Sequence, residues 1–128
     1  MKRQPEFQLQ KAVTRYLSVQ YPDVLFLSDT IANVKLTMSQ AIRNKSIQKE
    51  NFKCPDIIIL KPNSVYHGLL LELKVKSPFK SDGTLLKNDH LQGQYNTIVQ
   101  LNKLKYFACF VVGFDSAKAI IDNYMKIN

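Results

Sequence analysis

Two charged residues interrupt an otherwise apolar stretch of the sequence, GLLLELKV, at residues 68–75. Because side chains alternate along a β-strand, Glu72 and Lys74 project from the same face. Burying either charge is costly unless it is paired or bound to a metal ion. Asp56 opens the preceding apolar run, DIIIL, directly after Pro55. If the two runs pair as a hairpin through the KPNSVYH turn, two carboxylates and an ammonium group converge.

Such a set of side chains suits the hydrolysis of a phosphodiester bond. That reaction needs a hard cation to polarise the phosphoryl oxygen and to activate water, and carboxylate oxygens are the ligands that Mg²⁺ prefers. A lysine beside the metal can stabilise the developing negative charge or help to deprotonate the water. The alternative for Glu72 and Lys74 is an exposed charge pair on an edge strand, which the apolar residues around them disfavour.

Hydrophobic periodicity predicts the elements that must position these residues. The order is α-β-α-β-β-α-β-α, and the segment SDTIANVKLT after the first strand is polar and irregular. The predicted helices cover 6–21, 37–49, 90–105 and 114–124, and the predicted strands cover 24–27, 56–60, 68–75 and 106–112. Capping residues precede three of the helices: Thr37 with Gln40, Asp89 with Gln92, and Asp115 or Ser116.

This order fits an α/β fold in which helices flank a central mixed β-sheet. The 128 residues suffice for one core, so we expect a single domain over residues 1–128. No apolar run approaches the roughly 18 residues needed to span a bilayer, and the first ten residues lack the apolar stretch of a secretory signal. Cys54 and Cys109 adjoin apolar segments without metal-ligand spacing, so we expect buried free thiols in a reducing cytoplasm.

The charge of the chain favours a polyanionic partner. Lys and Arg number 18 against 10 Asp and Glu, which gives a formal charge of +8 and a pI near 9.5. Nucleic acid is the leading candidate because phosphate neutralisation supplies most sequence-independent affinity for DNA. A surface of solvated lysines is the alternative.

These residues resemble the PD…(D/E)xK nuclease superfamily, with Pro55-Asp56, a gap of fifteen residues, and then Glu72-Leu73-Lys74. Over roughly residues 6–125 the chain resembles one branch, the VRR-NUC domains, which implies a restriction-endonuclease-like fold. The matching segments are the opening helix with Glu6 and Gln10, PDIII, HGLLLELKVKSPFKSDG, HLQGQ and YFACFVVGFDSAKAII.

The resemblance implies a role for each residue of the two strands. Asp56 and Glu72 would ligate a divalent metal, Mg²⁺ or Mn²⁺. The main-chain carbonyl of Leu73 would also face the metal, and Lys74 would act near the attacking water.

Three further residues are implied by the same resemblance. Glu6 would complete the acidic cluster or hold a second ion, although a first-turn carboxylate also suits the helix dipole. Gln94 would orient the site or contact the phosphate, with Gln92 as the alternative. Gln10 is a weaker candidate on the same helix face as Glu6. The chain departs from the family at Cys54, where a glycine is expected.

Basic residues flank the proposed site in sequence and could collectively follow a phosphate backbone. His90 is a secondary candidate for phosphate contact. His67 sits by the predicted turn, away from the carboxylates, so we expect a structural or solvent-exposed role rather than a catalytic one. The basic candidates are Lys35, Arg43, Lys45, Lys49, Lys76, Lys80 and Lys87.

The function implied is an endonuclease that cuts DNA with little sequence readout. Small stand-alone members of the resembled family are similar to Holliday junction resolvases and act as homodimers, so branched DNA is the preferred substrate. The alternatives are a nuclease of simpler duplex or nicked DNA in a restriction or repair system, a non-catalytic DNA-binding module, and an adaptor for an acidic partner. The expected location is the cytoplasm, or a host cytoplasm for a phage-encoded protein.

Overall fold

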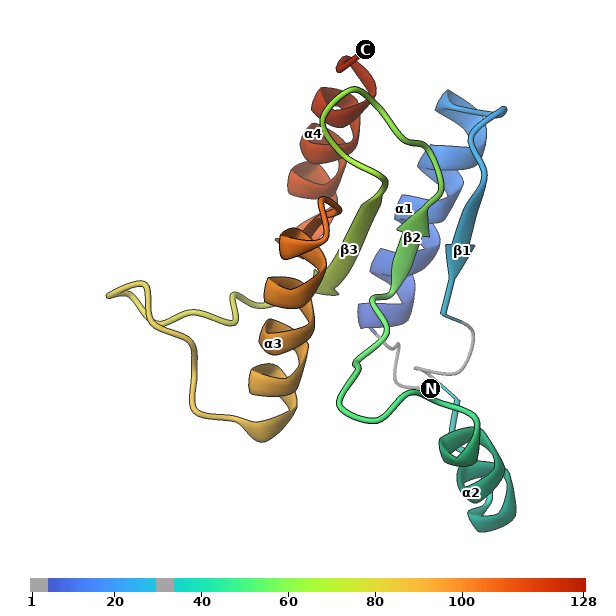
Figure 1. The fold of residues 1–128 in the computed structure, drawn as a ribbon, viewed down its shortest axis with the longest axis vertical. Coiled ribbons are helices and arrows are strands. Elements are labelled where there is room, and N and C mark those ends of the chain that lie inside the picture. Colours follow the sequence, from blue (N-terminus) through green and yellow to red (C-terminus); the bar gives the residue numbers. More distant parts are fainter. Residues whose placement is uncertain (1–4, 30–33) are drawn as a thin grey trace.

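The computed structural model describes residues 5–29 and 34–128, and its elements follow the predicted order (Figure 1). Residues 30–33, part of the segment expected to be irregular, lie outside the described residues. The elements are α1 (Pro5–Gln20), β1 (Phe26–Ser28), α2 (Met38–Ser46), β2 (Ile57–Ile59), β3 (Leu69–Lys74), α3 (Asp89–Lys103), β4 (Phe107–Val112) and α4 (Gly113–Met125).

The four strands form one mixed sheet in the order β1-β2-β3-β4. β2 pairs antiparallel with both β1 and β3, which confirms the predicted hairpin. β3 pairs parallel with β4, so the chain must cross from one end of the sheet to the other between them, and α3 makes that crossover. The α/β fold with helices flanking a mixed sheet, inferred from the sequence, is therefore confirmed.

Helices cover both faces of the sheet, and the alternation along β3 separates two packed clusters. Leu69, Leu71 and Leu73 lie in a buried cluster with side chains of α1 and α4. Leu70 packs on the other face against α3, where Ile98 and its neighbours are buried. Because Glu72 and Lys74 alternate in step with Leu70, both face α3 rather than the larger cluster.

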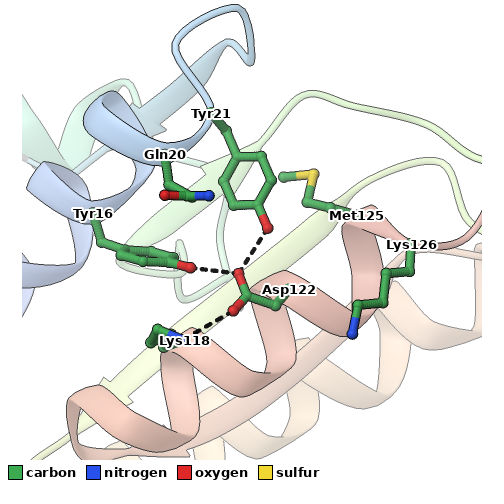
Figure 2. Close-up of a pocket in the computed structure, with 7 residues that line it drawn as sticks. All are labelled: Tyr16, Gln20, Tyr21, Lys118, Asp122, Met125 and Lys126. Carbon is green, nitrogen blue, oxygen red and sulfur yellow. Dashed lines mark hydrogen bonds and ion pairs between the residues drawn. The ribbon is translucent and has the colours of Figure 1, made fainter.

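A polar contact joins α1 to α4 at the edge of the larger cluster (Figure 2). The hydroxyl groups of Tyr16 and Tyr21 both donate to Oδ1 of Asp122, at 2.6 and 2.7 Å. Lys118 donates to the second oxygen, Oδ2, at 3.2 Å and lies over the ring of Tyr16. These bonds lower the pKa of Asp122, the bond from Tyr16 contributing most.

Two segments extend away from these layers. α2 begins with the predicted capping box, in which Thr37 and Gln40 bond reciprocally, but none of its residues is buried. The segment 75–88 projects from the end of β3 and is held by buried Pro78 and by Phe79, whose ring meets that of Phe110 at 5.8 Å. In Figure 1, α2 and this segment lie on opposite sides of the same end of the sheet.

The structure corrects two predicted helix starts. α3 is capped by Asn88, whose side chain accepts from the backbone N–H of Leu91, rather than by Asp89. α4 follows β4 directly, with no side-chain cap from Asp115 or Ser116. Gly113 makes that turn at φ 81°, a conformation that a glycine adopts without strain.

The expectation of two buried thiols is wrong for Cys54. Its residue is exposed because it lies in the irregular segment before β2 rather than within a strand, whereas Cys109 is half-buried in β4. Within 5–29 and 34–128, no helix is both long enough and apolar enough to cross a membrane.

Candidate active site

The residues singled out in the sequence meet at one end of the sheet, drawn at the bottom of the strands in Figure 1. β2 begins there just after Asp56, and β3 ends there at Lys74. Ile57 pairs with Leu71, so continuing the antiparallel register by one residue sets Asp56 opposite Glu72. α3 also begins at this end, because the crossover to β4 starts where β3 finishes.

The carboxyl groups of Asp56 and Glu72 are neighbours. Oδ2 of Asp56 accepts from the backbone N–H of Leu73 at 2.7 Å, and the two carboxyl groups share a hydrogen bond. Burial raises the pKa of Glu72 to about 9, and the charge of Asp56 contributes in the same direction. Burial also raises the pKa of Asp56, against the bonds from Glu72 and Leu73, which lower it.

Gln94 connects the carboxylate to the lysine. Its Nε2 donates to Oε1 of Glu72 at 3.0 Å, and its Oε1 accepts from Nζ of Lys74 at 2.7 Å. The residue is 6% exposed, so both bonds lie in a protected environment. Gln92 is instead exposed and donates to Asn96, so the structure brings Gln94 and not Gln92 into the cluster.

His90 lies one turn before Gln94, and its Nε2 is 3.1 Å from Nε2 of the amide. Burial lowers the pKa of His90, and the ammonium groups of Lys74 and Lys53 lower it further. The carboxylates of Glu6 and Asp56 act in the opposite direction. A neutral imidazole can accept the amide hydrogen, so His90 joins the polar network of the site.

Residues of α1 support this network from the other side. Gln10 is 7% exposed, and its Nε2 donates to Oγ of Ser28 at 2.7 Å and to the carbonyl of Asp29 at 2.9 Å. Gln10 therefore joins α1 to the end of β1. Glu6 is exposed in the first turn of α1, within electrostatic range of His90. Its metal-binding role stays a prediction.

Asp29 is a residue of this site that the sequence reasoning missed. Its backbone N–H donates to the carbonyl of Asp56 at 2.8 Å, and its charge raises the pKa of both Asp56 and Glu72. The available signal was the position of Asp29 directly after a predicted strand. When that strand pairs antiparallel with the strand that follows Asp56, its end lies at the same end of the sheet as Asp56.

The site offers two neighbouring carboxyl groups to a divalent cation. Across residues 5–29 and 34–128, no three His, Cys, Asp or Glu side chains gather closely enough to bind a metal by themselves. Asp56 and Glu72 supply two carboxylates, and Leu73 lies between them and Lys74. Burial raises the pKa of both carboxyl groups, and a cation bound here would favour their charged forms. A role for the Leu73 carbonyl stays a prediction.

The predicted basic residues lie on both projecting segments and are all exposed. α2 and its flanks carry one group, and the segment 75–88 carries the other, with the end of the sheet between them (Figure 1). His67 lies at the opposite end of β3, where its ring meets that of Tyr106. The two groups are Lys35, Arg43, Lys45 and Lys49, and Lys76, Lys80 and Lys87.

Comparison with solved structures identifies a protein of similar fold. No family model and no curated protein matches the sequence. Among solved structures, the chain is similar to a VRR_NUC domain protein with a TM-score of 0.64 and 20% identity, covering 100% of this chain and 93% of that one. The chain therefore has the restriction-endonuclease-like fold of a VRR_NUC domain protein along its whole length.

Proposed function

We propose that this chain is a single domain, residues 1–128, that hydrolyses phosphodiester bonds of DNA as a divalent-metal-dependent endonuclease. The observation that carries the proposal is the continuous network from Asp56 through Glu72 and Gln94 to Lys74 at one end of the sheet. The shared fold with a VRR_NUC domain protein supports the same reading.

Asp56 and Glu72 would hold the metal ion, Mg²⁺ or Mn²⁺, with the main-chain carbonyl of Leu73 as a further ligand. When bound, such an ion polarises the phosphoryl oxygen and lowers the pKa of a water molecule. Lys74 stabilises the negative charge that develops on the phosphoryl group. Gln94 positions both partners, because it bonds the carboxylate and the ammonium group at once.

We propose branched DNA as the substrate and a homodimer as the active form, acting in the cytoplasm. The charge of +8 and the two basic segments beside the site support a long phosphate contact on either side of the scissile bond. Two copies related by a two-fold axis would present two sites to symmetrically placed strands.

The test compares cleavage of a labelled four-way junction and a matched linear duplex with Mg²⁺, Mn²⁺ or chelator. We expect metal-dependent cleavage by the wild type, with the junction cut faster, and loss of cleavage in Glu72→Ala. Asp23→Ala is the matched control, because Asp23 is exposed beyond the far end of α1.

Each proposal has its own contrary result. Binding of DNA without metal-dependent cleavage would contradict the enzyme and leave a DNA-binding module. Equal rates on junction and duplex would contradict the branched substrate. Cleavage that survives Glu72→Ala would contradict the assigned site. If sedimentation analysis finds a monomer and this monomer cleaves DNA at the full rate, the proposed homodimer is contradicted.

A further inference from the structure

The segment that leads into Asp56 is fastened to α3. The backbone N–H of Lys53 donates to Oγ1 of Thr97 at 2.9 Å, and Thr97 is 1% exposed. Phe52, one residue earlier, packs against the cluster of Leu70 and Ile98. The backbone of Lys53 is therefore fixed against the helix that carries Gln94.

The side chain of Lys53 continues along the same helix and occupies the space beside Gly93. A Cβ at position 93 would lie 3.1 Å from Cε of Lys53 and 3.3 Å from Cγ. Glycine inside a helix is less favourable than alanine, so this glycine does not serve the helix itself. Its missing side chain leaves room for the lysine stem one residue before Gln94.

The ammonium group of Lys53 is then within electrostatic range of the site. It contributes electrostatically at His90, as Lys74 does, and His90 contacts Gln94. The ion pair found in residues 5–29 and 34–128 is that between Lys118 and Asp122, so within those ranges no carboxylate lies within ion-pair distance of Lys53. An exposed cation with a fixed stem and no acidic partner there suits an anionic ligand.

We propose that Lys53, seated on Gly93, is a phosphate-binding residue that contacts the DNA backbone next to the scissile phosphate. This inference rests on the proposed nuclease function. Lys74 is held by Gln94 and acts at the reacting phosphate. Lys53 belongs to the segment before β2, and its stem passes Gly93 of α3; among the described residues its ammonium group has no bond like that of Lys74. The ammonium groups of Lys53 and Lys74 would thereby fix the direction in which the DNA strand crosses the carboxyl groups of Asp56 and Glu72.

Two variants test the contact separately. Lys53→Met keeps the apolar stem and removes the charge, while Gly93→Ala keeps the charge and displaces the stem. Binding of duplex and junction DNA is measured with Ca²⁺ in place of Mg²⁺ over a series of salt concentrations. Lys103→Met, in the last turn of α3, is the control for loss of one exposed lysine from the same helix.

We expect Lys53→Met to weaken binding at low salt by about five- to tenfold and to reduce the slope of log K against log salt by about 0.9. Gly93→Ala should weaken binding in the wild-type background and have no further effect in Lys53→Met. Its melting temperature should not fall, because alanine favours the helix. With Mg²⁺, Lys53→Met should raise KM more than it lowers kcat.

An unchanged salt slope in Lys53→Met would overturn the phosphate contact. Equal losses in Lys53→Met and Lys103→Met would also overturn it, since net charge alone would then explain both. Additive effects of Lys53→Met and Gly93→Ala would overturn the seat on Gly93. If the wild type binds DNA but never cuts it, the nuclease proposal fails. The slope of log K against log salt still shows whether Lys53 contacts a phosphate.

Discussion

Replacing Glu72 with glutamine should stabilise the metal-free protein. The side chain is 4% exposed and lies beside Asp56, and its pKa is raised to about 9. An amide of the same shape can accept from Gln94 and donate to Asp56, so both contacts survive, whereas Glu72 of the folded wild type must keep a proton at pH 7 to remain neutral. The wild type therefore carries an electrostatic cost in its folded state that Glu72→Gln removes.

The size of the gain follows from the pKa. A group whose pKa is raised on folding contributes stability below its unfolded value of 4.5, and this stability is lost as the pH rises toward 9. Between pH 4.5 and pH 7 the loss is about 1.4 kcal/mol per pH unit. Relaxation and water entry reduce the cost of a buried charge, so we expect Glu72→Gln to gain roughly 1–3 kcal/mol at pH 7 and less than about 1 kcal/mol at pH 5.

Urea unfolding in chelator at pH 5 and pH 7 measures this difference, and thermal unfolding with Mg²⁺ completes the test. Metal should raise the melting temperature of the wild type, because a ligand that binds only the folded state stabilises it, and should have little effect on Glu72→Gln. A variant that is less stable than the wild type in chelator at pH 7 would refute the reasoning. So would a gain that is the same at both pH values.

Three further substitutions test other contacts of the fold and site. Gln94→Ala should lower kcat and metal affinity about 10- to 100-fold, because it releases both Glu72 and Lys74, as cleavage kinetics and metal titration would measure. Gln10→Leu should cost about 1–3 kcal/mol in urea unfolding, because polar groups at the end of β1 lose a buried donor. Asp122→Asn should cost about 1–2 kcal/mol at neutral pH, and the difference should shrink below about pH 4, because the lowered pKa of Asp122 makes its contribution disappear as acid protonates it.

Each of these has a matched control in the chain. Gln92→Ala removes an exposed amide from the same helix and should leave kcat unchanged. Gln8 is exposed on α1, and Lys118 is an exposed partner of Asp122 that also lies over the ring of Tyr16. Gln8→Leu and Lys118→Met should each change the urea midpoint less than the variant that they control. If a control variant changes the measured quantity as much as the test variant does, the contact assigned to the test residue is contradicted.

Much of the fold was predictable because local patterns determine it. The continuous apolar runs at 56–60 and 68–75 and the turn between them predicted the hairpin, and the register then brought Asp56 to Glu72. The contributions of Asp29 and Lys53 depend on contacts between segments distant in sequence. Lys53 contacts Gly93 and Thr97, which lie forty or more positions later in the chain, and the hydrophobic periodicity of the sequence does not predict such contacts.

The predicted helix starts failed for a local reason. Asn88 and Asp89 are adjacent and both favour the cap position, so sequence alone could not choose between them. At α4 the chain turns at Gly113 without any side-chain cap, and a search for capping residues misplaces such a start. The choice between Gln92 and Gln94 likewise required knowing which face of α3 meets β3.

Because β3 pairs parallel with β4, the position of Gln94 on α3 does not depend on the sequence of the segment that connects β3 to α3. α3 must run back along the whole sheet to begin β4, so its first turns lie beside the end of β3 whatever connects them. The part of the connection between Phe79 and the cap residue Asn88 can therefore change length or sequence without displacing Gln94. Insertions and substitutions in that part should therefore leave the spacing of Glu72, Lys74 and Gln94 unchanged, which makes it the place where this fold can best accept new sequence.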